Sequence, residues 1–253
     1  MAEAKTVTAA MLIIGNEILS GRTKDANLAY IAERLNALGI RLAEARVVPD
    51  VPGEIVDAVN ALRARYTYVF TSGGIGPTHD DITAECIARA FGVKLAVHPE
   101  ALRRLEERYA EIGVELNEAR LRMAKTPEGA ALIDNPVSAA PGFQIGNVFV
   151  MAGVPKIMQA MFESLRDRLV GGDPLLSRII VCDLPEGHIA SGLAAVQNRH
   201  PEVDIGSYPS YATSGFRVAL VLRHTRQDAL DAAARDVIAL IRDLGGSPQE
   251  QAV

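Results

Sequence analysis

The sequence contains no tryptophan and only two cysteines, and so few cysteines argue against both a disulfide framework and a cysteine-bound metal. Cys86 and Cys182 lie far apart, and neither has a second cysteine at the spacing of a metal-binding pair. A disulfide framework and a cysteine-bound metal are therefore not expected. Two isolated cysteines are typical of reduced thiols in the cytoplasm, where we expect the protein to be located.

Long apolar runs are also missing. A membrane-spanning helix requires roughly 18 uninterrupted apolar residues, and no stretch of the sequence reaches that length. Residues 1–6 include an acidic residue and no apolar run, so they do not resemble a secretory leader. We expect neither export nor a membrane partner.

Positive charge is scarcer than negative charge, because 26 Lys and Arg residues face 31 Asp and Glu residues, giving a formal net charge of -5. Broad surfaces that neutralise the phosphates of nucleic acids require clustered Lys and Arg. Nucleic acid is therefore not an expected partner.

Short apolar runs alternate with helical patterns through the first two thirds of the sequence. The run 7–14 is typical of a buried strand, and Gly39 is placed to end the helix that follows. The predicted order is strand 7–14, helix 28–38, strand 40–48, helix 52–65, strand 66–70, helix 81–91, strand 148–151 and helix 155–169. Such alternation predicts an α/β fold with right-handed crossovers onto a mostly parallel sheet that is covered on both faces.

The segment Gly171–Pro174 is the best candidate for a domain boundary, because flexible glycines precede a proline that cannot continue a helix. We predict an α/β domain over residues 1–172 and a smaller α+β domain over residues 173–253. Within the second domain the patterns indicate strands 178–184, 203–207 and 215–223 and a helix 227–244. Two charged helices, 99–113 and 117–125, fall outside the alternation and could form a lid, an interface or plain packing.

A glycine-rich segment follows the predicted strand 66–70. Gly73, Gly74 and Gly76 lie between this strand and a helix, where bare backbone N–H groups and the helix N-terminus can receive a phosphate. The spacing matches neither the GxGxxG pattern nor a Walker loop, because no lysine follows the glycines. A tight structural turn is the alternative interpretation.

Acidic residues occur beside this segment and after two other strands. Asp80 and Asp81 would repel a phosphate unless a divalent cation such as magnesium lay between them, although an aspartate at a helix start is also a favoured cap. Glu17 and Asp50 each follow a predicted strand, and Asp50 could merely cap the next helix. His79 is interpreted as a solvent-facing loop residue. No Ser/His/Asp or Cys/His set is evident, so covalent catalysis is not expected.

Four motifs in the same order resemble the molybdopterin-binding domain family of the MoaB/Mog type. The resemblance is closest to the amino-terminal region of CinA-type competence/damage-inducible proteins, and 178–223 is similar to their second domain. It implies a three-layer α/β/α fold. CinA-type chains commonly carry an additional carboxy-terminal amidase domain, which we do not expect within these 253 residues. The motifs are Gly15–Gly21, Ser72–Thr83, Pro141–Phe143 and Gly153–Pro155.

The resemblance implies two enzymatic activities. In adenylyltransferases of the family, two acidic positions that fall here on Asp50 and Asp81 assist the magnesium-dependent transfer of AMP to molybdopterin. In the CinA-type branch, which Gly15-Asn-Glu17 and the paired Asp80-Asp81 resemble more, the implied activity is metal-dependent hydrolysis of pyrophosphate bonds in ADP-ribose- or FAD-like compounds. We therefore expect a nucleotide pyrophosphatase. An adenylyltransferase of molybdenum cofactor biosynthesis and a non-catalytic cofactor-binding protein are the alternatives.

These expectations define a set of candidate site residues. The catalytic candidates are Glu17, Asp50 and Asp81, and the candidate ligands of a divalent metal are Asp50, Asp80 and Asp81. The expected partner is a nucleotide or a phosphate-bearing pterin, with molybdopterin as one such ligand. We also expect a homo-oligomer, with helices 99–125 as a potential interface. The predicted ligand-binding residues are Gly15, Asn16, Ser20, Ser72, Gly73, Gly74, Gly76, Pro77, Thr78, Thr83, Gly153 and Pro155.

Overall fold

The computed structural model describes residues 7–212 and 215–251, which form two compact units divided between Gly172 and Asp173. Each unit has its own sheet and its own core. Within the described ranges, no helix combines the length and the apolar character needed to span a bilayer.

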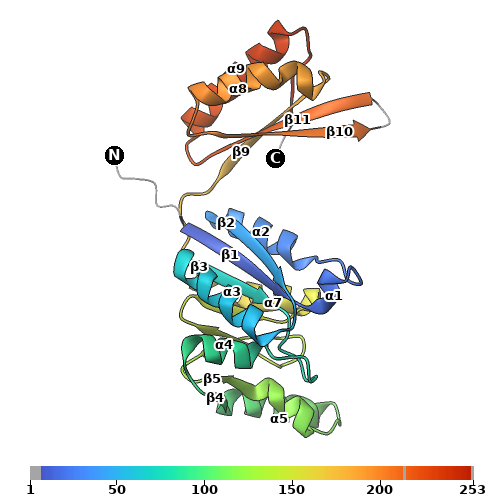
Figure 1. Ribbon diagram of the computed structural model, residues 1–253, viewed down its shortest axis with the longest axis vertical. Coiled ribbons are helices and arrows are strands. Elements are labelled where there is room, and N and C mark those ends of the chain that lie inside the picture. Colours follow the sequence, from blue (N-terminus) through green and yellow to red (C-terminus); the bar gives the residue numbers. More distant parts are fainter. Residues whose placement is uncertain (1–6, 213–214, 252–253) are drawn as a thin grey trace. The chain divides into compact units, whose positions relative to one another are not determined.

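The first unit begins with the alternation of strands and helices that the sequence predicts (Figure 1). Its strands are β1 (Val7–Ile14), β2 (Ile40–Val48), β3 (Tyr68–Ser72), β4 (Leu95–Val97), β5 (Lys125–Pro127), β6 (Ala131–Ile133), β7 (Gly142–Ile145) and β8 (Val148–Met151). Its helices are α1 (Asn16–Leu19), α2 (Asn27–Ala37), α3 (Pro52–Arg65), α4 (Thr83–Phe91), α5 (Pro99–Glu111), α6 (Glu118–Leu121) and α7 (Pro155–Leu165), with short 3-10 helices η1 (Arg122–Ala124) and η2 (Arg166–Arg168).

The main sheet has six strands in the order β2-β1-β3-β8-β7-β6. The first four strands pair in parallel, which confirms the mostly parallel sheet. Strands β7 and β6 add to it in antiparallel fashion. The reversal occurs in the two-residue turn between β7 and β8, where Gly146 has φ 54°, a conformation that favours glycine.

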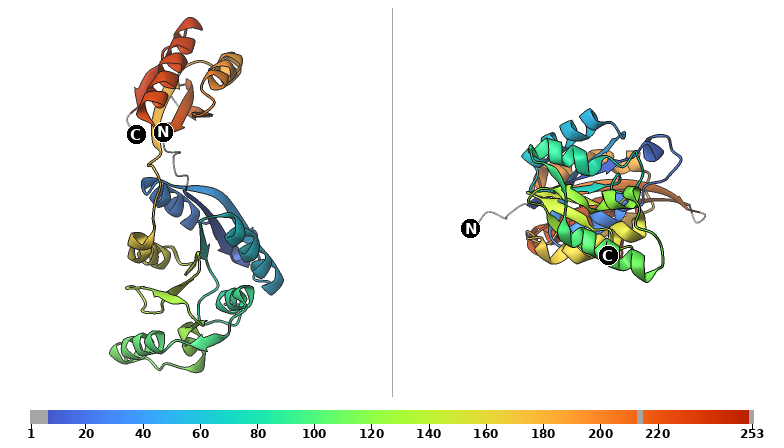
Figure 2. Two further views of the ribbon diagram at one scale, coloured as in Figure 1. Left: turned by 90° about the vertical axis from the view of Figure 1, so that its left-hand side faces the viewer. Right: turned by 90° about the horizontal axis from the view of Figure 1, so that it is seen from below.

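The two faces of this sheet build two separate hydrophobic cores. Alternate residues of β1 point to opposite faces, so that Leu12 and Ile14 pack with α3 and α4, and Met11 and Ile13 pack with α2 and α7. The helices consequently lie on both sides of the sheet, as the left view of Figure 2 shows. The predicted three-layer α/β/α fold is confirmed.

The segment between α4 and β6 forms a small lobe with its own antiparallel pair, β4-β5. Ala101, Leu105 and Ala124 form a buried hydrophobic cluster in it, and α5 is its main helix (Figure 1). The sequence predicts one helix over 117–125, whereas the chain forms α6 and η1 and then enters β5.

The second unit contains a four-stranded antiparallel sheet in the order β10-β11-β9-β12 and two helices. Core residues from the sheet and from both helices, among them Ile180, Leu220 and Val237, pack together. Helix α8 was not predicted, because only Ile189 and Val196 of it are buried and its apolar pattern is weak. The elements are β9 (Leu176–Cys182), α8 (Glu186–Arg199), β10 (Asp204–Ala212), β11 (Gly215–His224), α9 (Gln227–Asp243) and β12 (Gln249–Gln251).

Candidate functional site at the carboxyl ends of the parallel strands

The carboxyl ends of the four parallel strands bring the main motifs to one edge of the sheet. Backbone hydrogen bonds hold these loops in place, since Gly15 N donates to Val48 O at 3.1 Å and Gly73 N donates to Met151 O at 3.2 Å. Ligands of open α/β sheets bind at this edge. The architecture therefore places the glycine segments at the expected position for a ligand site.

The glycine-rich segment packs too tightly for side chains at two of its positions. Gly73 has φ 110°, and a β-carbon there would lie 2.1 Å from the backbone oxygen of Ile14. Gly74 has φ 68°, and a β-carbon there would lie 2.2 Å from Thr83 Oγ1. Thr83 is fully buried and donates from Oγ1 to Gly73 O at 2.9 Å. These two glycines are required by the turn itself.

The same turn leaves a row of backbone donors free. Within residues 7–212 and 215–251, the amides of Gly74, Ile75 and Gly76 make no hydrogen bond. Successive backbone N–H groups in such a turn form a concave site for an anion. The structural-turn and phosphate-binding interpretations are thus compatible, because the packing of Gly73 and Gly74 shapes the turn that presents these donors.

Two acidic side chains fold back over glycines at this edge. A β-carbon at Gly15 would lie 2.5 Å from Glu17 Oε2, and one at Gly76 would lie 2.6 Å from Asp81 Oδ2. Asp81 Oδ2 accepts hydrogen bonds from Thr78 N at 2.8 Å and from Thr78 Oγ1 at 2.5 Å. In the described part of the chain, Oδ1 of Asp81 and both carboxylate oxygens of Glu17 accept no hydrogen bond.

Asp50 and Asp80 are placed differently. Asp50 Oδ2 accepts a hydrogen bond from Asn16 N at 2.9 Å, so it fixes the start of α1 instead of capping α3. Asp80 is exposed, and contact with Thr78 and with its own backbone amide lowers its pKa below the usual value. The expectation that Asp80 or Asp81 caps α4 is wrong, because no side chain caps that helix.

Glu17, Asp81 and the free amides line one pocket of about 500 Å³, which we call the rim pocket. Asp50 and Asp80 are not among its lining residues. Predicted residues in its lining are Glu17, Gly73, Gly74, Gly76, Pro77, Asp81, Gly153 and Pro155. Ile75 and Val154 also line it and lie within the motifs, although they were not predicted to bind ligand. Lining residues outside every motif are Thr23, Met123, Asn135, Ser138, Ala140, Ala152, Ile157 and Met161.

The other predicted ligand-binding residues do not line the rim pocket. Gly15 leaves room for the Glu17 carboxylate, and Asn16 and Ser20 are exposed. Ser72 and Thr83 are buried behind the glycine turn, where their hydroxyl groups make hydrogen bonds within the protein. Thr78 instead holds Asp81.

The described residues do not form a metal site from protein side chains alone. Among the residues described, no three His, Cys, Asp or Glu side chains are placed to hold a metal ion together, so Asp50, Asp80 and Asp81 do not form the predicted ligand set. Magnesium is often held by one or two carboxylates together with substrate phosphates. Glu17 and Asp81, which share a pocket with free amide donors, fit a cation that is shared with a substrate in this way.

Asn27 is a buried polar residue behind the rim pocket that the sequence patterns did not single out. It is 3% exposed, and its Nδ2 donates to Ser72 Oγ at 2.7 Å and to Gly153 O at 2.8 Å. It therefore connects the carboxyl end of β3 to the loop after β8. A β-carbon at Gly153 would lie only 3.2 Å from Gly73 Cα, so these loops are in close contact.

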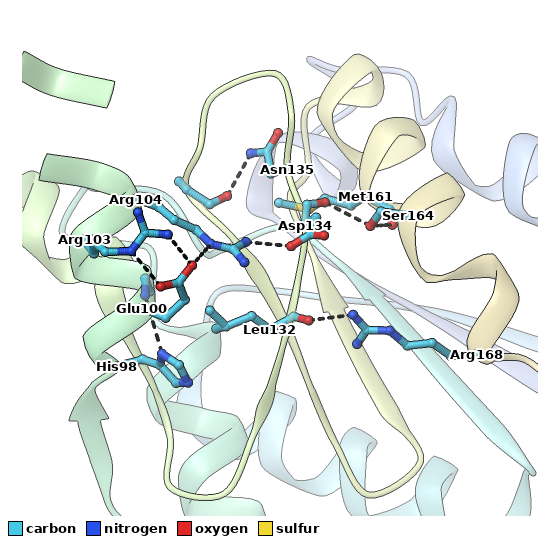
Figure 3. A network of polar contacts seen from close by, with 12 residues as sticks. His98, Glu100, Arg103, Arg104, Leu132, Asp134, Asn135, Met161, Ser164 and Arg168 are labelled. Atoms are coloured by element: carbon cyan, nitrogen blue, oxygen red, sulfur yellow. Dashed lines mark hydrogen bonds and ion pairs between the residues drawn. The ribbon is translucent and has the colours of Figure 1, made fainter. Parts of the chain in front are cut away.

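A network of polar contacts joins the lobe to the main sheet layer (Figure 3). Arg104 on α5 donates to Asp134 Oδ1 at 2.6 Å, and Asp134 O accepts from Ser164 Oγ on α7 at 3.0 Å. The adjacent Asn135 donates to Ala140 O at 2.8 Å and closes a loop that lines the rim pocket. Hydrogen bonds thus connect the lobe, through Asp134, to the loop that forms one wall of the rim pocket.

The charge of Glu100 supports this network. Hydrogen bonds from Arg103 and then Arg104 lower the pKa of Glu100 to about 2, so its carboxylate is ionised throughout the physiological range. Glu100 Oε1 accepts from Arg104 Nε at 2.7 Å, which orients the Arg104 side chain toward Asp134 (Figure 3).

A three-layer α/β/α domain with a ligand pocket beyond its parallel strands defines the class of this protein. Residues 10–170 match the family described as "Probable molybdopterin binding domain", and the chain belongs to this family. Residues 174–245 match the family described as "FAD synthase, middle domain". The MoaB/Mog-type resemblance stated from the sequence motifs is confirmed.

Relatives match both units. A protein from Pyrobaculum calidifontis is 34% identical over 255 residues, covering 93% of this chain and 96% of its own. A "Probable FAD synthase" from Caenorhabditis elegans is 33% identical over 264 residues, and the chain spans about half of it, 50%. The crystal structure of CinA from Thermoplasma acidophilum is 35% identical with a TM-score of 0.60, covering 64% of this chain and 98% of that one.

Proposed function

We propose that the first unit binds a dinucleotide through its diphosphate and hydrolyses the pyrophosphate bond, acting on ADP-ribose- or FAD-like compounds with the help of a divalent metal. One observation carries the proposal: the unbonded amides of Gly74, Ile75 and Gly76 share the rim pocket with the carboxylates of Glu17 and Asp81. The match of the second unit to a domain of FAD synthases supports a nucleotide ligand.

The free backbone amides of the glycine turn are suited to binding the negatively charged phosphates of the substrate. Backbone N–H groups that are already oriented can stabilise negative charge as it develops on a phosphate, without reorganisation during the reaction. The two carboxylates would repel a diphosphate by themselves, so a cation between them and the phosphates is needed for binding. A divalent ion held by Glu17, Asp81 and the substrate would neutralise the negative charge on the leaving phosphate.

The reaction consumes one water molecule. Its oxygen forms a bond to one phosphorus of the P–O–P bridge, the bond from that phosphorus to the bridging oxygen breaks, and the bridging oxygen leaves on the other phosphate. Glu17, whose carboxylate oxygens are free of hydrogen bonds in the described residues, takes one proton from the water and returns it to solvent. ADP-ribose then gives AMP and ribose 5-phosphate, and FAD gives AMP and FMN.

The proposal is tested by AMP release from ADP-ribose and from FAD with magnesium, manganese or cobalt. Asp81→Asn is the informative variant, because an amide oxygen can still accept both hydrogen bonds from Thr78 while the negative charge is lost. We expect AMP release to fall by at least about a hundredfold, the scale typical of a lost electrostatic contact. Asp57→Asn, an exposed carboxylate on α3, serves as the matched control.

Adenylyl transfer is a second candidate, favoured by the relatives that are named "Probable FAD synthase". It predicts consumption of ATP only when an acceptor such as FMN or molybdopterin is added. A binding protein without turnover predicts saturable ADP-ribose binding that survives Asp81→Asn, with no product from any substrate. Absence of AMP release with every metal, at high protein concentration, would reject hydrolysis.

A further inference from the structure

The loop between β6 and β7, residues 134–141, forms one wall of the rim pocket, and we call it the wall loop. Asn135, Ser138 and Ala140 of this loop line the pocket. The first residue of the loop, Asp134, is held by the polar network of Figure 3. The wall loop is therefore attached to ordered parts of the fold where it begins.

One residue of the wall loop adopts an unfavourable backbone conformation. Ala139 has φ 64°, and among the described residues it is the only non-glycine residue with a positive φ. The β-carbon of an L-amino acid disfavours this left-handed region, which glycine adopts at little cost. Such a conformation persists only where surrounding contacts impose it, and it is concentrated at functional sites.

The side chain of Asn135 imposes the shape of the loop. It is 6% exposed, and its Oδ1 accepts hydrogen bonds from Val137 N at 3.0 Å and from Ser138 N at 3.2 Å. Its Nδ2 donates to Ser138 Oγ at 2.7 Å and to Ala140 O at 2.8 Å. The backbone oxygen of Asn135 accepts from Ala139 N at 3.1 Å. One buried residue thus holds both sides of the strained position.

These contacts leave Ser138 ready to bind a ligand. Thr23, Asn135 and Ser138 are the neutral polar side chains in the lining of the rim pocket, and both amide atoms of Asn135 are already used within the loop. Ser138 Oγ accepts from Asn135, so its oxygen is fixed in place, and its hydroxyl hydrogen has no acceptor among the described residues. No hydrogen bond in the same residues orients the Thr23 hydroxyl.

We infer that Ser138 donates a hydrogen bond to an oxygen of the ligand in the rim pocket, and that Asn135 is a positioning residue that maintains the strained wall loop for this contact. The inference rests on the proposed function for the choice of ligand and adds two residues to it. Phosphate oxygens and sugar hydroxyl oxygens of a dinucleotide both provide the acceptor that Ser138 requires.

Binding is measured by calorimetry with magnesium and α,β-methylene ADP-ribose, in which a carbon replaces the bridging oxygen so that the pyrophosphate bond cannot be hydrolysed. Ser138→Ala removes the hydroxyl group and leaves the bond from Asn135 Nδ2 to Ala140 O in place. Ser138→Thr keeps the hydroxyl group. Ser191→Ala, at an exposed position of α8 in the second unit, is the matched control.

We expect Ser138→Ala to bind the analogue at least about threefold more weakly, and more than about tenfold if the acceptor is a charged phosphate oxygen. Its Tm should stay within about 2 °C of the unmodified protein. Ser138→Thr and Ser191→Ala should keep the affinity within about twofold. An affinity of Ser138→Ala within the same limit, or no binding of the analogue to the unmodified protein, would overturn the inference.

The positioning role of Asn135 has its own test. Asn135→Ala should weaken binding more than Ser138→Ala does, because Ala139 then relaxes out of the left-handed region and Ser138 moves with it. Adding Ala139→Gly to Asn135→Ala makes that region accessible again and should recover at least about threefold in affinity. A lower Tm of Asn135→Ala with normal affinity, or no recovery by Ala139→Gly, would overturn the positioning role.

A second probe identifies the acceptor oxygen. Methylenediphosphonate carries the phosphate oxygens without the sugars. If Ser138 contacts a phosphate oxygen, Ser138→Ala should weaken the binding of both probes, whereas contact with a sugar hydroxyl predicts that only the ADP-ribose analogue is affected. Both results support the contact. Unchanged binding of both probes would overturn it.

The inference and the proposed hydrolysis fail in different ways. Weaker binding of the analogue to Ser138→Ala, together with no AMP release from ADP-ribose under any metal, would reject the pyrophosphatase and keep the role of Ser138. AMP release by the unmodified protein, combined with an unchanged KM and unchanged analogue binding in Ser138→Ala, would keep the enzyme and reject the inference. If both hold, Ser138→Ala should raise KM with little change in kcat.

Discussion

Replacement of Asn27 by alanine tests how the two loops of the rim pocket are held together. The buried Nδ2 of Asn27 donates to Ser72 Oγ and to Gly153 O, and the substitution removes both bonds. Ser72 Oγ keeps its own bond to Ala152 O at 3.3 Å, whereas Gly153 O loses the Asn27 donor. The loop after β8 should therefore lose more order than the loop after β3.

The magnitude follows from the cost of unsatisfied buried groups. Each lost partner costs about 1–3 kcal/mol, so two give about 2–6 kcal/mol. Asn27 Oδ1 is itself buried and makes no hydrogen bond within the described residues, so its removal recovers about 1 kcal/mol. We expect a net loss of about 1–5 kcal/mol in the free energy of unfolding, or a drop in Tm of roughly 2–20 °C.

Urea and thermal unfolding measure this loss, and ADP-ribose binding measures its effect on the pocket. Asn27→Asp keeps the volume but turns a carboxylate oxygen toward Gly153 O, so it should destabilise more than Asn27→Ala. Asn36→Ala, at an exposed position of the same helix, should change stability by less than about 0.5 kcal/mol. Equal stability of Asn27→Ala and the unmodified protein would refute the reasoning.

Three further predictions concern stability and reactivity. Gly73→Ala should cost more than about 3 kcal/mol in chemical denaturation, since φ 110° and contact with Ile14 O disfavour a β-carbon, while Gly53→Ala, with nothing within 4 Å, should be neutral or stabilising. Burial raises the pKa of Cys86 to about 11, so a thiol reagent at pH 8 should modify it only after denaturation, and modification in the native state would contradict this. Hydrogen bonds from His200 and then Arg199 lower the pKa of Asp236 in the folded protein. The ionised Asp236 carboxylate therefore stabilises the fold at pH values above its unfolded-state pKa, and this stabilisation is lost as pH falls through its folded-state pKa. Asp236→Asn should thus lose less than about 1 kcal/mol at pH 7, because the pair is partly exposed, and in urea titrations the difference should begin to shrink as pH falls below about 4. A stability difference between Asp236→Asn and the unmodified protein that increases as pH falls would contradict this prediction.

Much of the first unit could be predicted because its signals are local. Strands 7–14, 40–48 and 148–151 have the bounds of β1, β2 and β8. Apolar runs mark β1 and β8, and Gly15 and Pro49 follow directly after β1 and β2. The three-residue strands β4, β5 and β6 carry too few residues to show a period. β4 and β5 pair with each other in the lobe, and β6 pairs with β7 at the edge of the main sheet, so all three depend on tertiary pairing.

The part of the candidate site that could be predicted consists of its glycines, its two carboxylates, Pro77 and Pro155. Glu17 and the segment around Asp81 follow strands, so parallel topology brings them to one edge. Asp50 also follows a strand, yet its carboxylate is occupied by Asn16 N, a contact that depends on loop conformation. Met123 and Asn135 reach the pocket from the lobe and from the loop after β6, and no spacing in the sequence marks them.

The most direct test of the account is a crystal structure of the Asp81→Asn variant soaked with ADP-ribose and magnesium. The account predicts diphosphate oxygens within about 3 Å of the amide nitrogens of Gly74, Ile75 and Gly76, with Glu17 beside them. A diphosphate bound elsewhere on the protein, with these amides contacting no part of the ligand, would contradict it.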